Sequence, residues 1–151
     1  MKYNIKKLSA KDISLAKELI ILWKTEDGIE NPQPPNDLYI NTLLAKNSFH
    51  IYVALINKAV VGGLTAYELP MFPEEETEMF LYEIGVHQDH RKQGIAAKLI
   101  EALKKTWRER NIKIAFVGTT TNNKPAKQLY KSTGANQEKV AWFIYDLGEG
   151  K

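Results

Sequence analysis

Cysteine is absent from this sequence of 151 residues. The protein therefore has no disulfide framework, no thiolate metal ligand and no thiol nucleophile. Long apolar runs are missing as well, since none approaches the ~20 residues that a membrane-spanning helix needs. The first six residues lack the apolar stretch of a secretory signal. Together these absences predict a cytoplasmic protein with no membrane partner.

The sequence also lacks a large excess of one charge sign, since the formal net charge is only +3. This balance predicts no nucleic-acid partner, and the cluster of Lys and Arg over 104–113 lies at the end of a predicted helix, where positive charge suits the helix dipole. The distribution is uneven: residues 1–86 contain 8 Lys and Arg against 12 Asp and Glu, and residues 87–151 contain 13 against 6. An acidic and a basic half are consistent with two ligands of opposite charge, although solvated helix faces would give the same pattern.

Length and composition predict a single domain over residues 1–151, with 44% hydrophobic and 26% charged residues. Apolar periodicity predicts a mixed α/β fold, with Ser9 as the cap of the first helix and Gly134 ending the last. The pattern from 78 to 118, strand then helix then strand, implies a parallel pair with a right-handed crossover. The predicted helices cover 11–24, 37–45, 94–110 and 124–133, and the predicted strands cover 3–7, 49–55, 59–68, 78–86, 112–118 and 140–147.

The turn from Arg91 to Ala96 joins the predicted central strand to the best amphipathic helix of the chain. A helix N-terminus carries unpaired N–H groups and partial positive charge, so Arg91 and Lys92 cost stability there unless an anion binds. Gly94 and Ala96 leave room for a diphosphate to approach the backbone. The glycine spacing fits neither a Walker loop nor a dinucleotide fingerprint. The turn therefore predicts an anion-binding site, although a tight turn needs glycine in any case.

Other chemistries find little support in the sequence. His87, His90 and His50 are the only histidines, and without cysteine they give no plausible zinc set, so we expect no metal. No serine lies in a Gly-x-Ser-x-Gly elbow, which argues against a nucleophilic triad.

Two motifs together resemble the GNAT acetyltransferase superfamily. The first is Leu81-Tyr82-Glu83-Ile84-Gly85-Val86 followed by Arg91-x-x-Gly94-x-Ala96, which is similar to the acetyl-coenzyme A motif of that superfamily. The second runs from Asn123 to Gly134 and resembles N-x-x-A-x-x-L-Y-x-x-x-G. With the segment Val61–Pro70, the chain looks closest to aminoglycoside 3-N-acetyltransferases, enzymes of antibiotic resistance.

The resemblance implies a central mixed sheet of about six to seven strands, about four helices and a splayed parallel strand pair. It implies acetyl-CoA as co-substrate and a homodimer, with Trp142, Phe143 and Tyr145 of the last strand as a contact. Gly85 would permit a bulge that opens the gap between the parallel strands. The residues expected to bind the cofactor are Ile84, Val86, Arg91, Lys92, Gln93, Gly94, Ile95, Ala96 and Asn123.

The resemblance also assigns the acetyl-transfer chemistry, to a primary amine of a small cationic acceptor by direct attack in a ternary complex. Glu83 would be the base and acceptor ligand, since a carboxylate in a central strand is costly without a partner. Tyr130 would be the acid for the departing sulfur, although it also fits a core aromatic residue. Glu68 and Glu30 would join Glu83 in binding the amine. A polyamine or peptide amine remains an alternative acceptor, and a non-catalytic coenzyme A sensor remains an alternative function.

Overall fold

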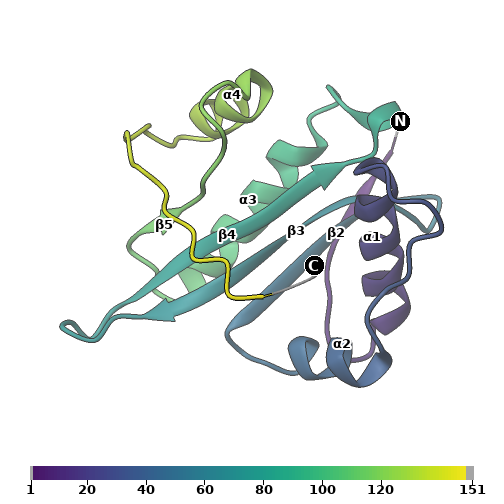
Figure 1. Cartoon of the computed structure of the whole chain (residues 1–151), viewed down its shortest axis with the longest axis horizontal. Coiled ribbons are helices and arrows are strands. Elements are labelled where there is room, and N and C mark those ends of the chain that lie inside the picture. Colours follow the sequence, from purple (N-terminus) through teal and green to yellow (C-terminus); the bar gives the residue numbers. More distant parts are fainter. Residues whose placement is uncertain (1, 149–151) are drawn as a thin grey trace.

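The chain forms one sheet with helices on both faces, as the computed structural model of residues 2–148 shows (Figure 1). Five strands lie side by side in the order β1-β2-β3-β4-β5. In chain order the elements are β1 (Asn4–Lys7), α1 (Ile13–Glu26), α2 (Asp37–Leu44), β2 (Phe49–Ile56), β3 (Ala59–Pro70), β4 (Thr77–Val86), the 3₁₀ turn η1 (Gln88–His90), α3 (Ile95–Glu109), β5 (Ala115–Phe116) and α4 (Lys124–Ser132).

The four predicted helices are present, with ends that differ by no more than two residues from those predicted. The cap of α1 was predicted at Ser9 and is instead Asp12. The Asp12 carboxylate accepts a hydrogen bond from the Ser9 backbone N–H (2.8 Å) and pairs with Lys6 Nζ (2.9 Å). These contacts connect the residues before α1 to β1. The helix therefore begins at Ile13, later than the cap predicted at Ser9 would place it.

The strands from β1 to β4 are antiparallel, and β4 pairs with β5 in parallel. The parallel pairing is confined to two residue pairs, Met79 with Ala115 and Phe80 with Phe116. The expected splayed parallel pair is therefore present. Its bulge is not at Gly85 as predicted, because the register between β3 and β4 shifts where Thr65 faces Glu83 and Ala66 faces Leu81. Tyr82 is the extra residue, two positions after Phe80 of the last parallel pair.

The predicted last strand, 140–147, is wrong, and so is the expected count of six to seven strands. Residues 135–148 have no regular secondary structure. A strand exists only through hydrogen bonds to a neighbouring strand, and among residues 2–148 no such pairing reaches this segment. Its large side chains are 73–92% exposed, namely Val140, Trp142, Phe143, Ile144, Tyr145 and Leu147.

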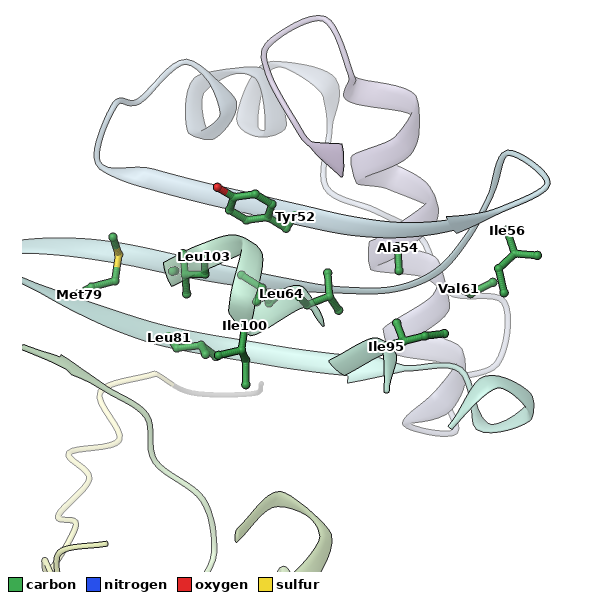
Figure 2. Close-up of a cluster of buried hydrophobic side chains, with 12 residues drawn as sticks. Tyr52, Ala54, Ile56, Val61, Leu64, Met79, Leu81, Ile95, Ile100 and Leu103 are labelled. Carbon is green, nitrogen blue, oxygen red and sulfur yellow. The ribbon is translucent and has the colours of Figure 1, made fainter. Parts of the chain in front are cut away.

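Two apolar clusters hold the helices against opposite faces of the sheet. On one face α3 packs Ile95, Ile100 and Leu103 against β2, β3 and β4 (Figure 2). On the other face α1 and α2 pack Leu19 and Ile40 against β2. The two faces are separate chemical environments, because successive side chains of a strand point to opposite sides.

Candidate functional site

The turn between β4 and α3 leaves backbone N–H groups free to bind an anion. Lys92 and Gly94 have positive φ angles of 60° and 80°, which bend the chain into a concave turn. Helix α3 has no side-chain cap and no acidic residue in its first turn. The first helical hydrogen bond at this end is donated by Lys98 N–H to Gly94 O at 3.0 Å. The amides that precede Lys98 in the helix therefore have no helical acceptor and suit a diphosphate.

The predicted cofactor residues of this turn differ in what they offer. Lys92, Gln93 and Gly94 are exposed, and a Cβ on Gly94 would meet no atom within 4 Å. Ile95 is 1% exposed and belongs to the core with its side chain, so only its backbone can face a ligand. Ala96 is half-buried in the first turn of α3. The residues present thus fit a diphosphate held by backbone groups and by Lys92.

The side chain of Arg91 forms hydrogen bonds to other residues of the protein. Its Nε donates to Val86 O at 3.0 Å and its Nη2 donates to Glu26 Oε1 at 2.9 Å. Glu26 also accepts the Gln88 N–H at 3.0 Å. The last residue of α1 therefore contacts the turn that precedes α3 at two points.

The backbone of Ile84 and Val86 faces the gap beside β4. His87 N–H donates to Val61 O at 2.7 Å, and Val86 lies opposite Gly62 in the register. Hydrogen-bonded pairs alternate with unbonded pairs in an antiparallel ladder. The N–H and C=O groups of Ile84 and Val86 therefore point away from β3, toward the side where β5 has ended. This open strand edge matches the predicted place for the pantetheine arm.

A cavity of about 610 Å³ lies between α1, α2 and the sheet. Glu83 lines it, and its Oε1 accepts a hydrogen bond from Thr65 Oγ1 at 2.7 Å. Asp27 supplies a second carboxylate, while Lys24 in the wall donates to Gln33 O at 2.6 Å. The remaining wall is mainly apolar and aromatic: Ala16, Leu19, Ile20, Trp23, Pro35, Tyr39, Ile40, Leu43, Leu44, Phe49, Ile51, Tyr67 and Tyr82. The cavity can hold a drug-sized amine next to two carboxylates.

Glu68, predicted to bind the acceptor, is on the opposite face of the sheet. It pairs with Met79 of the α3 face, and its side chain is only 9% exposed. Its carboxylate contacts His50 Nε2 at 2.6 Å and Arg110 Nη2 at 3.0 Å. A strand alternates its side chains, so Glu68 cannot share a face with Thr65. Glu68 therefore belongs to a hydrogen-bonded cluster on the α3 face and does not line the acceptor cavity.

Burial and ion pairing set the protonation of this cluster. Burial lowers the pKa of His50 and outweighs the hydrogen bond that His50 donates to Glu68, which acts in the opposite direction. Burial also opposes ionisation of Glu68, but the hydrogen bonds from Arg110 and His50 outweigh it and lower the pKa of Glu68. A neutral imidazole therefore donates Nε2–H to a carboxylate whose charge Arg110 balances.

Glu30, the other predicted acceptor ligand, is exposed in the loop after α1 and does not line the cavity. Asp27, three residues earlier at the end of α1, is in the wall instead. The acidic run Glu74 to Glu76 is exposed at the turn between β3 and β4 and is also outside the wall.

Tyr130 lies in a second cavity, of about 280 Å³, which it lines together with Leu81 and Phe116. Burial raises the pKa of Tyr130, so its hydroxyl keeps its proton at neutral pH. Leu81 points to the α3 face and Glu83 to the α1 face. Glu83 and Tyr130 therefore approach the gap beside β4 from opposite sides of the sheet.

Asn123 caps α4, since its Oδ1 accepts the Ala126 N–H at 3.1 Å. Its side-chain oxygen therefore has a structural role in the helix, beside the predicted role of Asn123 in cofactor binding. The side-chain NH₂ group of Asn123 remains as the donor for a hydrogen bond to the cofactor arm. Gly134 has a φ of 105° after α4, as predicted for the residue that ends a helix.

Sequence reasoning missed Trp23 as part of the site. Its indole Nε1 donates to Gly85 O at 3.2 Å, and the ring lines the larger cavity. A Cβ on Gly85 would lie 2.8 Å from Trp23 Nε1. The apolar face of α1 included Trp23 in the sequence, but its partner is 62 residues away and no local signal marks it.

Within residues 2–148, no group of three or more His, Asp or Glu side chains is arranged to hold a metal ion. No helix of the described chain combines the length and apolarity needed to cross a bilayer.

Known proteins are similar to this chain in sequence and in structure. Residues 16–135 match the model of the Acetyltransferase (GNAT) family. An aminoglycoside acetyltransferase from an uncultured soil metagenomic sample, meta-AAC0020, is similar in structure: its complex with sisomicin is 29% identical, the match covers 97% of each chain, and the TM-score is 0.90. Its complex with trehalose, over the same coverage, is 30% identical with a TM-score of 0.90.

Two curated relatives match over part of their length. The uncharacterized N-acetyltransferase YycN of Bacillus subtilis is 28% identical over 92 residues, which is 60% of this chain and 58% of that protein. L-2,4-diaminobutyric acid acetyltransferase of Methylotuvimicrobium alcaliphilum is 27% identical over 101 residues, 66% of this chain and 57% of that protein. The chain thus spans somewhat more than half the length of these relatives.

Proposed function

This chain belongs to the GNAT acetyltransferase family, whose members use acetyl-CoA, and from that premise we propose that it acetylates a primary amine of a small cationic acceptor in the cytoplasm. The observation that carries the proposal is the cavity of about 610 Å³ that contains Glu83 and Asp27 and lies beside the open edge of β4. Two carboxylates in a largely apolar cavity attract an ammonium group and hold it next to that edge.

Acetyl-CoA supplies an activated acetyl thioester at the strand edge when it is bound. Val86 N–H faces the same gap and is the donor for the thioester carbonyl oxygen. Glu83 accepts a proton from the attacking amine, directly or through one water, and Thr65 Oγ1 orients its carboxylate. Tyr130 donates its proton to the departing sulfur from the other side of the gap. Attack is direct within a ternary complex.

An aminoglycoside is the first acceptor to test, because the structure of meta-AAC0020 with sisomicin has the same fold over 97% of both chains. A small diamine is the second candidate. Its two ammonium groups would match the carboxylates Glu83 and Asp27, and a diaminobutyric acid acetyltransferase is among the relatives.

A thiol-release assay with acetyl-CoA tests the proposal against sisomicin, neamine, 2,4-diaminobutyrate, spermidine and peptide N-termini. We expect turnover with at least one cationic small amine. Silence with every aminoglycoside removes that acceptor class. Coenzyme A binding without turnover on any amine would favour a non-catalytic coenzyme A sensor instead.

We propose that the active form is a homodimer in which residues 140–147 contact a second copy. Trp142, Phe143 and Tyr145 are 73–88% exposed, and apolar side chains in such a row are rare on the surface of a monomer. Analytical ultracentrifugation should give twice the mass of one chain. The variant with Trp142→Ser and Phe143→Ser should sediment as a monomer, and a monomeric wild type would contradict the proposal.

A further inference from the structure

The last turn of α1 is fastened to the turn that leads into α3. Trp23 Nε1 donates to Gly85 O at 3.2 Å, at the end of β4. Three residues later, Glu26 Oε1 accepts from Gln88 N–H at 3.0 Å and from Arg91 Nη2 at 2.9 Å. Residues three apart lie on the same face of a helix. One helical face thus contacts three successive points of the chain that runs from β4 to the anion-binding turn.

Glu26 is not a solvated surface carboxylate. Its side chain is only 18% exposed, compared with 59% for its partner Arg91. A half-buried carboxylate that accepts one backbone N–H and one guanidinium N–H is well satisfied. It lies outside the wall of the acceptor cavity, whereas its neighbour Asp27 lines it. Binding of the acceptor therefore does not explain why a carboxylate is placed at position 26.

The contacts of Arg91 explain what Glu26 does. Arg91 Nε donates to Val86 O at 3.0 Å, so its side chain folds back over the end of β4. Glu26 holds the same guanidinium from the other side. The main chain between Val86 and Arg91 is thereby closed into a fixed loop, directly before the positive φ angles of Lys92 and Gly94.

We infer that Glu26 is a positioning residue for the cofactor, acting through Arg91. It fixes the loop from Val86 to Arg91 so that the amides after Lys92 are already arranged for the diphosphate. It also neutralises part of the positive charge that would otherwise build up at the N-terminus of α3 in the absence of cofactor. Contact with the phosphates is left to the backbone amides and to Lys92. The inference rests on the proposed function only in that the turn must bind coenzyme A.

Calorimetric titration with coenzyme A, without any acceptor, tests this role. Glu26→Gln keeps an oxygen for the Gln88 N–H but removes the charge that holds Arg91. We expect coenzyme A to bind about tenfold more weakly, the effect of losing one charge-assisted hydrogen bond. The matched control is Asp37→Asn, which breaks the 2.7 Å ion pair between Lys17 of α1 and Asp37 of α2, away from the turn. It should leave coenzyme A affinity unchanged.

A double-mutant cycle with Arg91→Met separates positioning from general stability. If Glu26 acts through Arg91, adding Glu26→Gln to Arg91→Met should weaken coenzyme A binding no further. Thermal unfolding of each variant gives the stability change independently. A lower Tm with unchanged coenzyme A affinity in Glu26→Gln overturns the inference, because it shows a purely structural pair. Tighter binding also overturns it, since Glu26 would then compete with the diphosphate for Arg91. A wild type that does not bind coenzyme A overturns the proposed function as well.

Discussion

Glu83 combines two properties that a base in amine acetylation needs. It lines the larger cavity, and Thr65 Oγ1 donates to one of its oxygens at 2.7 Å, which leaves the other oxygen for the acceptor. The prediction from sequence therefore stands as a proposal with a defined geometry.

Glu83→Gln should lower kcat by about 10²- to 10⁴-fold, the usual contribution of a general base. Coenzyme A affinity should stay at the wild-type value, because the carboxylate faces the acceptor cavity. Steady-state assays with the best amine, together with calorimetry, measure both quantities. Glu109→Gln, which removes an equal charge at the exposed end of α3, is the control. Equal kcat in the two variants would remove Glu83 from the mechanism.

Tyr130 is the proposed proton donor, and burial raises the pKa of its hydroxyl. Tyr130→Phe should reduce kcat by about 10- to 100-fold and leave coenzyme A affinity intact, since only the hydroxyl is lost. Tyr3→Phe, at a tyrosine that packs against the core and lines neither cavity, serves as the control. A pH–rate profile adds a second readout: loss of activity caused by ionisation of Tyr130 should begin above its ordinary value of 10.0 and be absent in the Phe variant. Full activity of Tyr130→Phe would assign this residue to the core alone.

At the level of elements, the contact between α1 and β4 joins the acceptor cavity to the cofactor edge. Trp23 lies against Gly85 so closely that a Cβ there would come within 2.8 Å of the indole nitrogen. The glycine at position 85 is required by this helix, and the strand bulge is at Tyr82.

Gly85→Ala should push the indole away, break its hydrogen bond to Gly85 O and destabilise the fold by about 1–3 kcal/mol. Thermal unfolding should show a Tm lower by several degrees. Gly118→Ala is the control, because a Cβ on Gly118 meets no atom within 4 Å. Combining Gly85→Ala with Trp23→Leu should recover part of the loss relative to the sum of the single variants. If the losses of stability in the two single variants add up in the double variant, the two residues do not interact.

At the level of the whole molecule, the buried side chains of His50 and Glu68, together with the more exposed Arg110, tie the end of α3 to β2 and β3. Burial depresses the pKa of His50 below 6.5, so the unfolded chain takes up this proton first. The contribution of His50 to the free energy of unfolding is therefore complete above pH 6.5, and it is lost as the pH falls from 6.5 through the folded-state pKa. The lowered pKa of Glu68 acts in the same direction below its ordinary value of 4.5.

The Tm of the wild type should accordingly fall between pH 7 and pH 5. His50→Gln should show a smaller fall over the same interval, because the proton that destabilises the folded state is gone. Thr42→Ala removes an exposed hydroxyl of α2 outside the cluster, introduces or removes no titratable group, and should keep the wild-type slope. Differential scanning calorimetry at several pH values measures these slopes, and parallel curves for His50→Gln and wild type would contradict the assignment.

Much of the fold was determined by the sequence alone. Apolar periodicity predicted the four helices, and the glycines at 94 and 134 predicted where α3 begins and α4 ends. These signals are local, since a helix satisfies its own backbone and a positive φ favours glycine wherever it occurs. The conformation of the turn from Arg91 to Ala96 was predictable for the same reason, because its features lie within six consecutive residues.

Only the tertiary structure decided which side chains share the site. Glu68 and Glu83 both belong to predicted strands, but the bulge at Tyr82 and the alternation of faces put them on opposite sides of the sheet. Glu26 contacts Arg91, which is 65 residues away in the sequence, and no local pattern marks this pair. The segment 140–147 has the pattern of a strand and forms none, because pairing depends on a neighbour that the pattern does not specify. Periodicity determines what an element is, whereas register and packing between distant segments determine what it touches.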